Sequence, residues 1–394
     1  MGLAVGFTVG IGYGIMTIDA RLSSIAPGIP MTFSRFQVHR LRIPMRAAWH
    51  TAAGQTRHVE TLIVRAETTD GRALWTESCP LGDATYLPDT AATTLCVLRD
   101  LLLPPSLGVA LAAIPPPAWR GHPFAKHVLD SLIWLHRAET AGEPLWRTIG
   151  GLDREIPCGE AIGRRASVDA LLADAADAVA RGVPRVKLKI APGWDIEPLR
   201  AVRAAWPALP LMVDANGAYT PADLPIFQAL DALDLLMIEQ PLDYRDLAEH
   251  AALQARLATP LCLDESVTSL ADAERAIRLG AARIINLKPG RLGGIGPTIT
   301  VHDRCRDAGV GCWLGGMLET GLGSAMGLAL ATLPNCLYPA DLHPCGHHHD
   351  SGILREPLRE SSPHHLRPSA AAGLGVTVDP AAVARWSVET ITIK

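Results

Sequence analysis

The sequence predicts a closed barrel of parallel strands alternating with helices, next to a smaller α+β domain. From residue 156 onward, eight short apolar runs alternate with alanine-rich segments of helical spacing. Each run is continuous, which is typical of parallel strands that are buried on both faces. Charged residues close five successive runs at steps of roughly 25 residues, about the length of one strand and one crossover helix.

The first domain is expected over residues 31–155 and is α+β. Its strand signals are period-two or β-rich stretches, and its clearest helix carries an apolar face. The predicted strands and helix are Phe36–Ile43, Thr61–Glu67, Ala73–Glu77 and Phe124–Ala141. The tail, about residues 345–394, ends in a strand-like stretch at Ser387–Ile393, and we expect it to complete this domain.

The barrel is expected over residues 156–344. Its predicted strands are Ile156–Ile162, Pro184–Ile190, Leu211–Asp214, Leu235–Glu239, Leu261–Asp264, Arg283–Leu287, Gly311–Leu314 and Cys336–Tyr338. Helical spacing between them is clearest in Ser167–Arg181 and Leu270–Leu279. A doubly wound open sheet is the alternative, but it needs a glycine-rich phosphate-binding turn after the first strand, and Gly159–Gly163 matches poorly.

Residues 1–30 are apolar and glycine-rich and resemble neither domain. No positive region precedes the apolar run, and no small-residue cleavage pattern follows it. The many glycines disfavour a membrane-spanning helix. We interpret this segment as a loose extension or a wrongly assigned start, with a targeting or anchoring segment as the alternative.

The composition argues against a nucleic-acid or membrane partner. The formal net charge is −4, from 36 basic and 40 acidic residues, and no basic stripe with interleaved aromatic residues occurs. The cysteines form no Cys-x-x-Cys pair, which predicts reduced core thiols and a cytoplasmic protein. They are Cys79, Cys96, Cys158, Cys262, Cys305, Cys312, Cys336 and Cys345. We also expect a homo-oligomer.

Three acidic residues, Asp214, Glu239 and Asp264, close successive apolar runs. The ends of parallel strands converge on one mouth of a barrel, so these carboxylates should meet there. Close carboxylates repel one another unless a cation lies between them, and oxygen ligands suit Mg²⁺ or Mn²⁺. The alternative is that each acid caps the helix that follows it, but capping does not select acids on three successive strands.

Lysines flank these acids along the chain. Lys187 and Lys189 lie two apart on one predicted strand, so both amines should enter the barrel mouth, and Lys288 should face them across it. An exposed edge strand is the alternative for the pair, and the apolar surroundings disfavour it. Neighbouring ammonium groups are expected to lower each other's pKa, which makes a neutral lysine base available near pH 7. A cation between two bases predicts removal of a proton next to a carboxylate, through an enediolate.

Further motifs extend the pattern over most of the chain. They are Lys187–Asp195, Val213–Tyr219, Ile238–Leu242, Cys262–Ser266, Asn286–Gly294 and Trp313–Gly323, with Gly121–Lys126 and Pro144–Gly151 before the barrel. On these motifs the chain resembles the enolase superfamily, in its muconate-lactonizing branch, and within it the N-acylamino acid racemase / o-succinylbenzoate synthase group. The resemblance runs from about Met31 to the C-terminus.

This resemblance implies a modified TIM-type barrel, (β/α)7β, with a capping domain whose loops around Ala48–Gln55 and Leu81–Tyr86 close over the substrate. It implies three metal ligands (Asp214, Glu239, Asp264), an acid/base pair (Lys189, Lys288) and Lys187 as the electrostatic partner of Lys189. It also implies supporting or substrate-contacting roles for Asn216, Glu265, Arg291, Met317, Leu318 and Tyr86.

The chain departs from the family pattern in three places. Ala161 stands where a serine near the substrate carboxylate is frequent, and Leu135 and His136 follow Trp134 where an acidic residue is usual. The stretch His343–His349 is rich in histidine. We interpret its histidines as solvated, with a second metal site as the alternative.

The expected activity is metal-dependent removal of the α-proton of a small carboxylate substrate. Reprotonation on the opposite face would racemise an N-acyl (N-succinyl) amino acid, whereas loss of a β-hydroxyl would give o-succinylbenzoate, a menaquinone precursor. The two lysines permit racemisation, and the resemblance of Arg291, just beyond Lys288, to the racemase-capable members of the family favours it. Related alternatives are a dipeptide epimerase and a muconate cycloisomerase. A catalytically dead ligand-binding barrel would lack a ligand or a lysine, and a hydrolase or aldolase would use strand-end histidines or one Schiff-base lysine.

Overall fold

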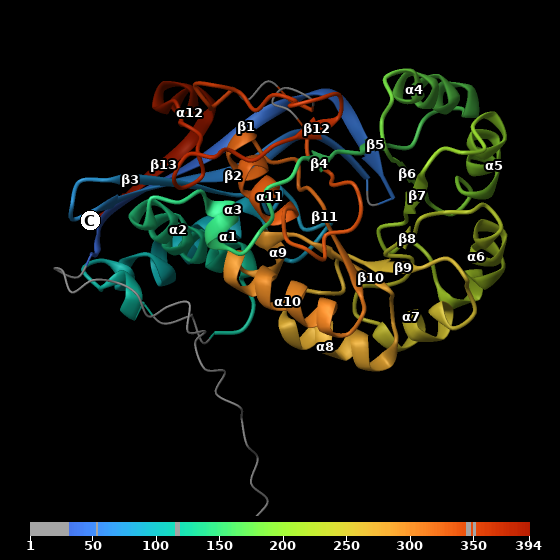
Figure 1. The fold of residues 1–394 in the computed structure, drawn as a ribbon, viewed down its shortest axis with the longest axis horizontal. Coiled ribbons are helices and arrows are strands. Elements are labelled where there is room, and N and C mark those ends of the chain that lie inside the picture. The colour runs from blue at the N-terminus through green and yellow to red at the C-terminus, as the bar shows by residue number, and fades with distance from the viewer. Residues whose placement is uncertain (1–30, 53, 115–118, 344–347, 350–351) are drawn as a thin grey trace, which may run out of the picture.

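The computed structural model describes residues 31–52, 54–114, 119–343, 348–349 and 352–394. The predictions for residues 1–30 therefore lie outside the described residues. An antiparallel sheet with its helices lies beside a ring of parallel strands that is wrapped by helices (Figure 1).

The antiparallel sheet has the strand order β13-β1-β2-β3. Strands β1 (Phe33–Thr51) and β2 (Gly54–Thr68) form a long hairpin, β3 (Ala73–Ser78) pairs with β2, and β13 (Ser387–Ile393) returns to pair with β1. The predicted strands are confirmed. The stretch Ala48–Gln55 is not a loop, because β1 and β2 remain paired as far as Thr51 and Gly54 and it forms the tip of their hairpin.

The helices of this part cover both faces of its sheet. They are α1 (Ala91–Val97), the π-helix Leu98–Leu102, the 3₁₀ turns Pro104–Ser106 and Leu111–Ala113, α2 (Pro123–Ala141), α3 (Leu145–Thr148) and α12 (Pro380–Trp386). The side chains around Leu62 pack with α2, and those around Ile63, on the other face, pack with α12. Helix α2 begins with a proline and ends at Gly142, whose φ of 66° is the left-handed conformation typical of a helix end. The helix predicted at Phe124–Ala141 is confirmed.

A buried histidine of α2 predicts that stability depends on pH. His127 is 3% exposed, and its Nε2 lies 3.0 Å from the carbonyl oxygen of Glu77. Burial lowers the pKa of His127 to about 4, below the value of about 6.5 in an unfolded chain. The unfolded state therefore binds more protons between these pH values, so stability is lost as pH falls from about 6.5 to 4.

Between pH 7 and pH 4, this histidine should lower the unfolding free energy by about 3 kcal/mol. Urea denaturation of the wild type and of His127→Gln at both pH values checks this. Between pH 7 and pH 4, the free energy of unfolding should fall by about 3 kcal/mol less in the variant than in the wild type. An identical loss in both proteins would contradict the assignment.

The second sheet has seven parallel strands in the order β11-β10-β9-β8-β7-β6-β5. Its strands are β5 (Glu160–Ile162), β6 (Val186–Lys189), β7 (Leu211–Asp214), β8 (Ile238–Glu239), β9 (Leu261–Leu263), β10 (Ile284–Leu287) and β11 (Gly311–Leu314). The helices are α4 (Val168–Ala180), α5 (Ile196–Ala205), the 3₁₀ turn Pro221–Asp223, α6 (Leu224–Asp231), α7 (Leu247–Gln254), α8 (Leu270–Leu279), α9 (Pro289–Leu292), α10 (Ile295–Asp307) and α11 (Gly321–Ala331).

Residues 336–340 close the ring without forming a regular strand. Cys336 forms a parallel bridge to Cys312 of β11, and Ala340 forms one to Cys158 just before β5. The regular strand predicted at Cys336–Tyr338 is therefore wrong, although the segment has the expected place. Seven strand–helix units plus this segment confirm the predicted (β/α)7β barrel.

The strand predicted at Ile156–Ile162 is split in two. Its first part, β4 (Ile156–Pro157), pairs with β12 (His365–Leu366) outside the barrel sheet. The break lies at Gly159, where a Cβ atom would come within 2.3 Å of the buried guanidinium of Arg185. Glycine at position 159 thus leaves room for this guanidinium beside the chain.

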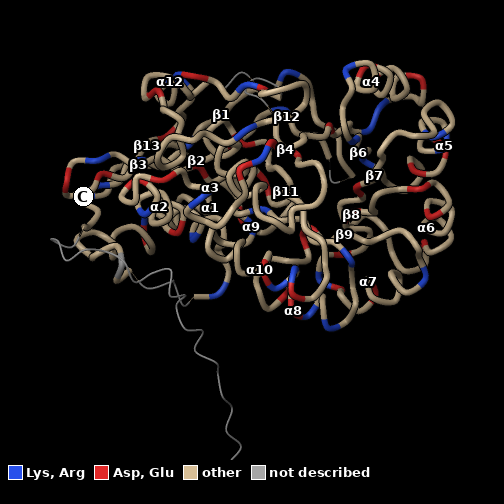
Figure 2. Tube along the Cα trace, in the orientation of Figure 1, with Lys and Arg blue, Asp and Glu red and all other residues tan. Residues whose placement is uncertain are grey.

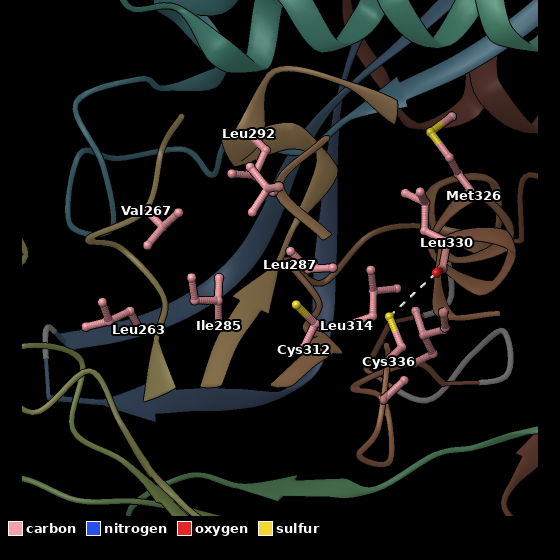
Figure 3. Packing of buried hydrophobic residues seen from close by; sticks show 14 of the residues in the cluster. Leu263, Val267, Ile285, Leu287, Leu292, Cys312, Leu314, Met326, Leu330 and Cys336 are labelled. Carbon is pink, nitrogen blue, oxygen red and sulfur yellow. Dashed lines mark hydrogen bonds between the residues drawn. The ribbon is translucent and has the colours of Figure 1, made fainter. Parts of the chain in front are cut away.

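Side-chain alternation along the barrel strands separates an outer apolar layer from the interior. Figure 3 shows Ile285 and Leu287 of β10 beside Leu314 of β11, in the layer that Met326 and Leu330 of α11 cover. Along each barrel strand, the residues that alternate with this outer layer point their side chains into the barrel interior. A buried cluster fills the barrel below the mouth: Met212, Met237, Cys262, Ile284 and Trp313.

The structure also bears on the predictions about charge, membrane-spanning segments and cysteines. Figure 2 shows basic and acidic residues interspersed along the trace. In the described part of the chain, no helix has the length and apolar character needed to cross a membrane. All described cysteines are free thiols and are buried except Cys96, which is exposed, and Cys345 lies outside the described residues.

Candidate active site

The two lysines of β6 enter the barrel interior at its mouth. Strand β6 lies between β5 and β7, so it is not an edge strand, and Lys187 and Lys189 are 5% and 8% exposed. Lys187 Nζ forms an ion pair with Asp341 and lies 3.4 Å from Glu239 Oε2. Lys189 Nζ forms an ion pair with Asp214 and lies 3.0 Å from Asn216 Oδ1.

Asp214 and Glu239 lie side by side at the ends of β7 and β8. They are partners in the strand register, and both are at most 1% exposed. Glu239 Oε1 accepts a hydrogen bond of 2.6 Å from the Asn286 amide, while Lys187 lies 3.9 Å from Asp214. One ammonium group thus lies within 4 Å of both carboxylates.

Asp264 follows β9 and belongs to a separate group of contacts. Lys288 Nζ donates to Asp264 Oδ2 at 2.8 Å, and Arg291 forms an ion pair with Oδ1. Tyr86, which comes from the first domain, also donates to Oδ1, at 2.7 Å, and its ring centroid lies 4.6 Å from Lys288 Nζ. Within the described residues, Lys288 and Arg291 form ion pairs with Asp264 and with neither of the other two acids.

None of the three acids caps the helix that follows it. The residues at the starts of α6, α7 and α8 are Asp223, Asp246 and Ser269. The helix-capping alternative is therefore wrong. Within the described ranges, no three His, Cys, Asp or Glu side chains converge closely enough to hold a metal ion. Each of the three acids is instead contacted by a lysine, arginine or asparagine side chain.

The charges at the mouth shift one another's pKa values. Burial would lower the pKa of Lys187, but Asp341 and Glu239 outweigh it and raise that pKa. The predicted mutual lowering by two lysines is wrong for Lys187, because acids surround it. Burial would raise the pKa of Asp214, but Lys189 and Lys187 hold it below its usual value. Burial and the charge of Asp214 raise the pKa of Glu265 to about 7.

A pocket at this mouth is lined by residues from both structural parts. Of the residues predicted for the site, the pocket wall contains Lys187, Lys189, Lys288, Asp214, Asn216, Glu265, Met317, Leu318 and Tyr86. Glu239 and Asp264 lie behind this wall, and Arg291 is fully buried against Asp264 and the carbonyl oxygen of Val267. Arg291 therefore supports the site from behind and does not line the pocket.

Backbone strain collects around this pocket. Leu81, Asn216, Gln240 and Leu318 have positive φ values of 71°, 45°, 37° and 67°, although none is glycine. Asn216 lies two residues after the end of β7, Gln240 directly follows β8, and Leu81 and Leu318 line the pocket. Strain of this kind persists only where the surrounding structure fixes it, and it is typical of functional sites.

The described histidines of the His343–His349 stretch line the pocket, and the prediction that they are solvated is wrong for His349, which is buried. His349 is 5% exposed, and its Nε2 lies 3.0 Å from the carbonyl oxygen of Leu318. His348 packs edge-on against Trp49, with 5.4 Å between ring centroids, and both line the pocket. Ala161, another departure from the family pattern, also lines it.

Asp341 and Asn286 complete the site, and the sequence did not single them out. Asn286 lies two residues before Lys288, so alternation along one strand was a signal that could have found it. Asp341 bridges Arg185 Nη2, at 2.6 Å, and Lys187. No local pattern marks Asp341, because it follows the irregular segment that closes the barrel.

Comparison with known proteins agrees with this geometry. Residues 170–382 match the family described as "Enolase C-terminal domain-like". The chain belongs to the enolase superfamily. This membership confirms the resemblance seen in the sequence and agrees with the capped (β/α)7β barrel.

Similar proteins cover nearly the whole described chain. An o-succinylbenzoate synthase of Geobacillus kaustophilus is 39% identical over 355 residues, 89% of this chain and 94% of that protein. An N-succinylamino acid racemase of Thermus thermophilus is 38% identical over 356 residues, 88% of this chain and 95% of that protein.

Solved structures show the same architecture. One described as "Probable Mandelate Racemase" from Alicyclobacillus acidocaldarius has a TM-score of 0.87 and 36% identity, covering 92% of this chain and 98% of that one. A dipeptide epimerase from Enterococcus faecalis, complexed with Mg and a dipeptide, has a TM-score of 0.81 and 25% identity, covering 88% and 99%.

Proposed function

We propose that this enolase-superfamily chain is an enzyme that removes the α-proton of an N-acyl amino acid carboxylate and returns it on the opposite face. The observation that carries the proposal is the placement of Lys189 and Lys288 in one pocket wall, with buried carboxylates between their strands. The similar proteins named as racemase and synthase support this reaction class.

We further propose that Asp214, Glu239 and Asp264 hold a divalent ion, Mg²⁺ or Mn²⁺. Their oxygen donors suit such an ion, and they close successive strands of the barrel. Glu265 Oε2, a buried oxygen without a hydrogen-bond partner, adds unsatisfied acceptor capacity beside them. A bound divalent ion would supply positive charge next to the substrate carboxylate.

The chain's own residues would move the proton. Lys189 lies on β6 and Lys288 at the end of β10, so the two amines reach the pocket from different sides of the ring. One neutral lysine would take the α-proton from one face of the substrate, and the other lysine would donate a proton to the opposite face. Lys187 would stay charged between Asp341 and Glu239 and would hold these acids in place.

The same intermediate also permits a synthase reaction. Loss of a β-hydroxyl group after proton removal would give o-succinylbenzoate, and relatives of both names are almost equally similar to this chain. Racemisation is the first candidate because it needs a lysine on each face, and both lysines line the pocket. Cytoplasmic location and a homo-oligomeric state stay predictions.

Exchange of the α-proton in D₂O tests the proposal. The wild type with Mg²⁺ should incorporate deuterium into N-succinyl or N-acetyl amino acids and should invert them, as followed by NMR and circular dichroism. The o-succinylbenzoate precursor is tested in parallel to separate the two outcomes. An absence of exchange and of turnover with all of these compounds would overturn the proposed function.

A further inference from the structure

A buried carboxylate of the first domain holds one wall of the pocket. Glu77 of β3 is 2% exposed, and no described lysine or arginine forms an ion pair with it. Its oxygens accept hydrogen bonds from Thr61 Oγ1 at 2.9 Å, from the Thr320 backbone amide at 2.9 Å and from the Gly323 amide at 2.8 Å. The Thr320 hydroxyl donates as well.

These donors offset the cost of burying the charge. An ionised carboxylate in a protein interior is costly unless hydrogen bonds or a cation satisfy it. Here the amides at the start of α11 supply hydrogen bonds and the positive end of the helix dipole. Gly323 leaves the necessary room, because a Cβ atom there would lie 2.9 Å from Glu77 Oε2.

The segment just before α11 is the apolar pocket wall, Met317 and Leu318. Leu318 has a φ of 67°, which is unfavourable for leucine and needs support from its surroundings. The Cys79 thiol, two residues after Glu77, donates to the Met317 carbonyl oxygen at 3.1 Å. The first domain thus fixes this segment from both ends, through Cys79 at Met317 and through Glu77 at Thr320.

We propose that Glu77 is a positioning residue that fixes Met317 and Leu318 and thereby sets the discrimination between substrate side chains. Both residues belong to an apolar cluster that includes Leu81 and line the pocket with it. They would therefore contact an apolar side chain of the substrate rather than the reacting carbon. The inference rests on the proposed racemase function.

The test compares a small and a bulky substrate in Glu77→Gln. The new amide group would direct N–H donors at the Thr320 and Gly323 amides, so the wall segment should shift. We expect the ratio of kcat/KM for N-succinylphenylalanine over N-succinylalanine to change by about fivefold or more, because contacts in an apolar pocket separate such substrates by factors of this order. The change should lie mainly in KM, with kcat for the preferred substrate within about threefold of the wild type.

Asp130→Asn is the matched control. Asp130 of α2 is also a buried carboxylate of the first domain, and it accepts a hydrogen bond of 3.0 Å from Gly296 in the first turn of α10. The same chemical change there should lower stability but leave the substrate ratio unchanged. A shift of α10 that also affects Lys288 would change kcat/KM for both substrates alike, because both use this lysine, so the ratio of the two kcat/KM values would not change.

Thr320→Val is the second variant, in case Glu77→Gln does not fold. It removes one donor to Glu77 and should shift the ratio in the same direction by a smaller factor. An unchanged ratio in the folded variants, or an equal shift in Asp130→Asn, would overturn the role of Glu77. A wild type inactive on both substrates would instead contradict the proposed function.

Discussion

Alanine at either Lys189 or Lys288 should abolish racemisation and leave exchange of only one enantiomer. With one lysine removed, the other can still take a proton from its own face and return it there, so deuterium enters without inversion. The opposite enantiomer presents its α-proton to the missing base and should not exchange. We expect a loss of about 10²–10⁴-fold in racemisation, the usual contribution of a positioned acid or base.

NMR in D₂O, started separately from each enantiomer, measures this difference. Lysines are rare here, since the chain contains only Lys126, Lys187, Lys189, Lys288 and Lys394. Lys126 lies on α2 outside the pocket wall, so Lys126→Ala is the matched control and should racemise normally. Calorimetry should show that both site variants still bind Mg²⁺. Racemisation that survives in either variant would exclude the two-base assignment.

Removal of divalent ions should abolish exchange of the α-proton. In Glu239→Gln, adding Mg²⁺ back should not restore this exchange. Glu239 is fully buried between Lys187 and Asn286, so glutamine keeps the shape while removing one negative charge. Ligand charge sets much of the affinity for hard cations, and we expect Mg²⁺ affinity to fall by about tenfold or more. Adding Mg²⁺ back to the chelated wild type should restore exchange.

Thermal unfolding gives a measurement that does not depend on activity. An ion that binds only the folded state raises its stability with ion concentration, so Mg²⁺ should raise the Tm of the wild type but barely that of Glu239→Gln. Glu319→Gln is the control, because Glu319 also lines the pocket but belongs to the segment between β11 and α11. Equal Mg²⁺ responses in the wild type and Glu239→Gln would contradict the proposed ligand role.

Local periodicity in the sequence was sufficient to place the strands that carry the site. Leu211–Asp214 and Gly311–Leu314 were predicted with the bounds that the structure shows, as was the helix Leu270–Leu279. Alternation along β6 also predicted correctly that Lys187 and Lys189 share one face. These features depend on neighbours within a few residues, which the sequence displays directly.

Contacts between segments that are far apart in the sequence decided the features of the site that local periodicity did not predict. Burial would lower the pKa of Lys187, but Asp341, 154 residues away, and Glu239 raise it. His349 is buried because it reaches the Leu318 carbonyl oxygen, although its own stretch looks like a solvated loop.

The sequence by itself therefore determined the barrel, its charged strand ends and the family. The tertiary structure alone decided which charges pair, and it placed Glu77 against the start of α11, 243 residues further along the chain. The physical reason is that strand and helix periods are local, whereas the ion pairs and buried hydrogen bonds of a pocket depend on side chains that only the closed fold brings together.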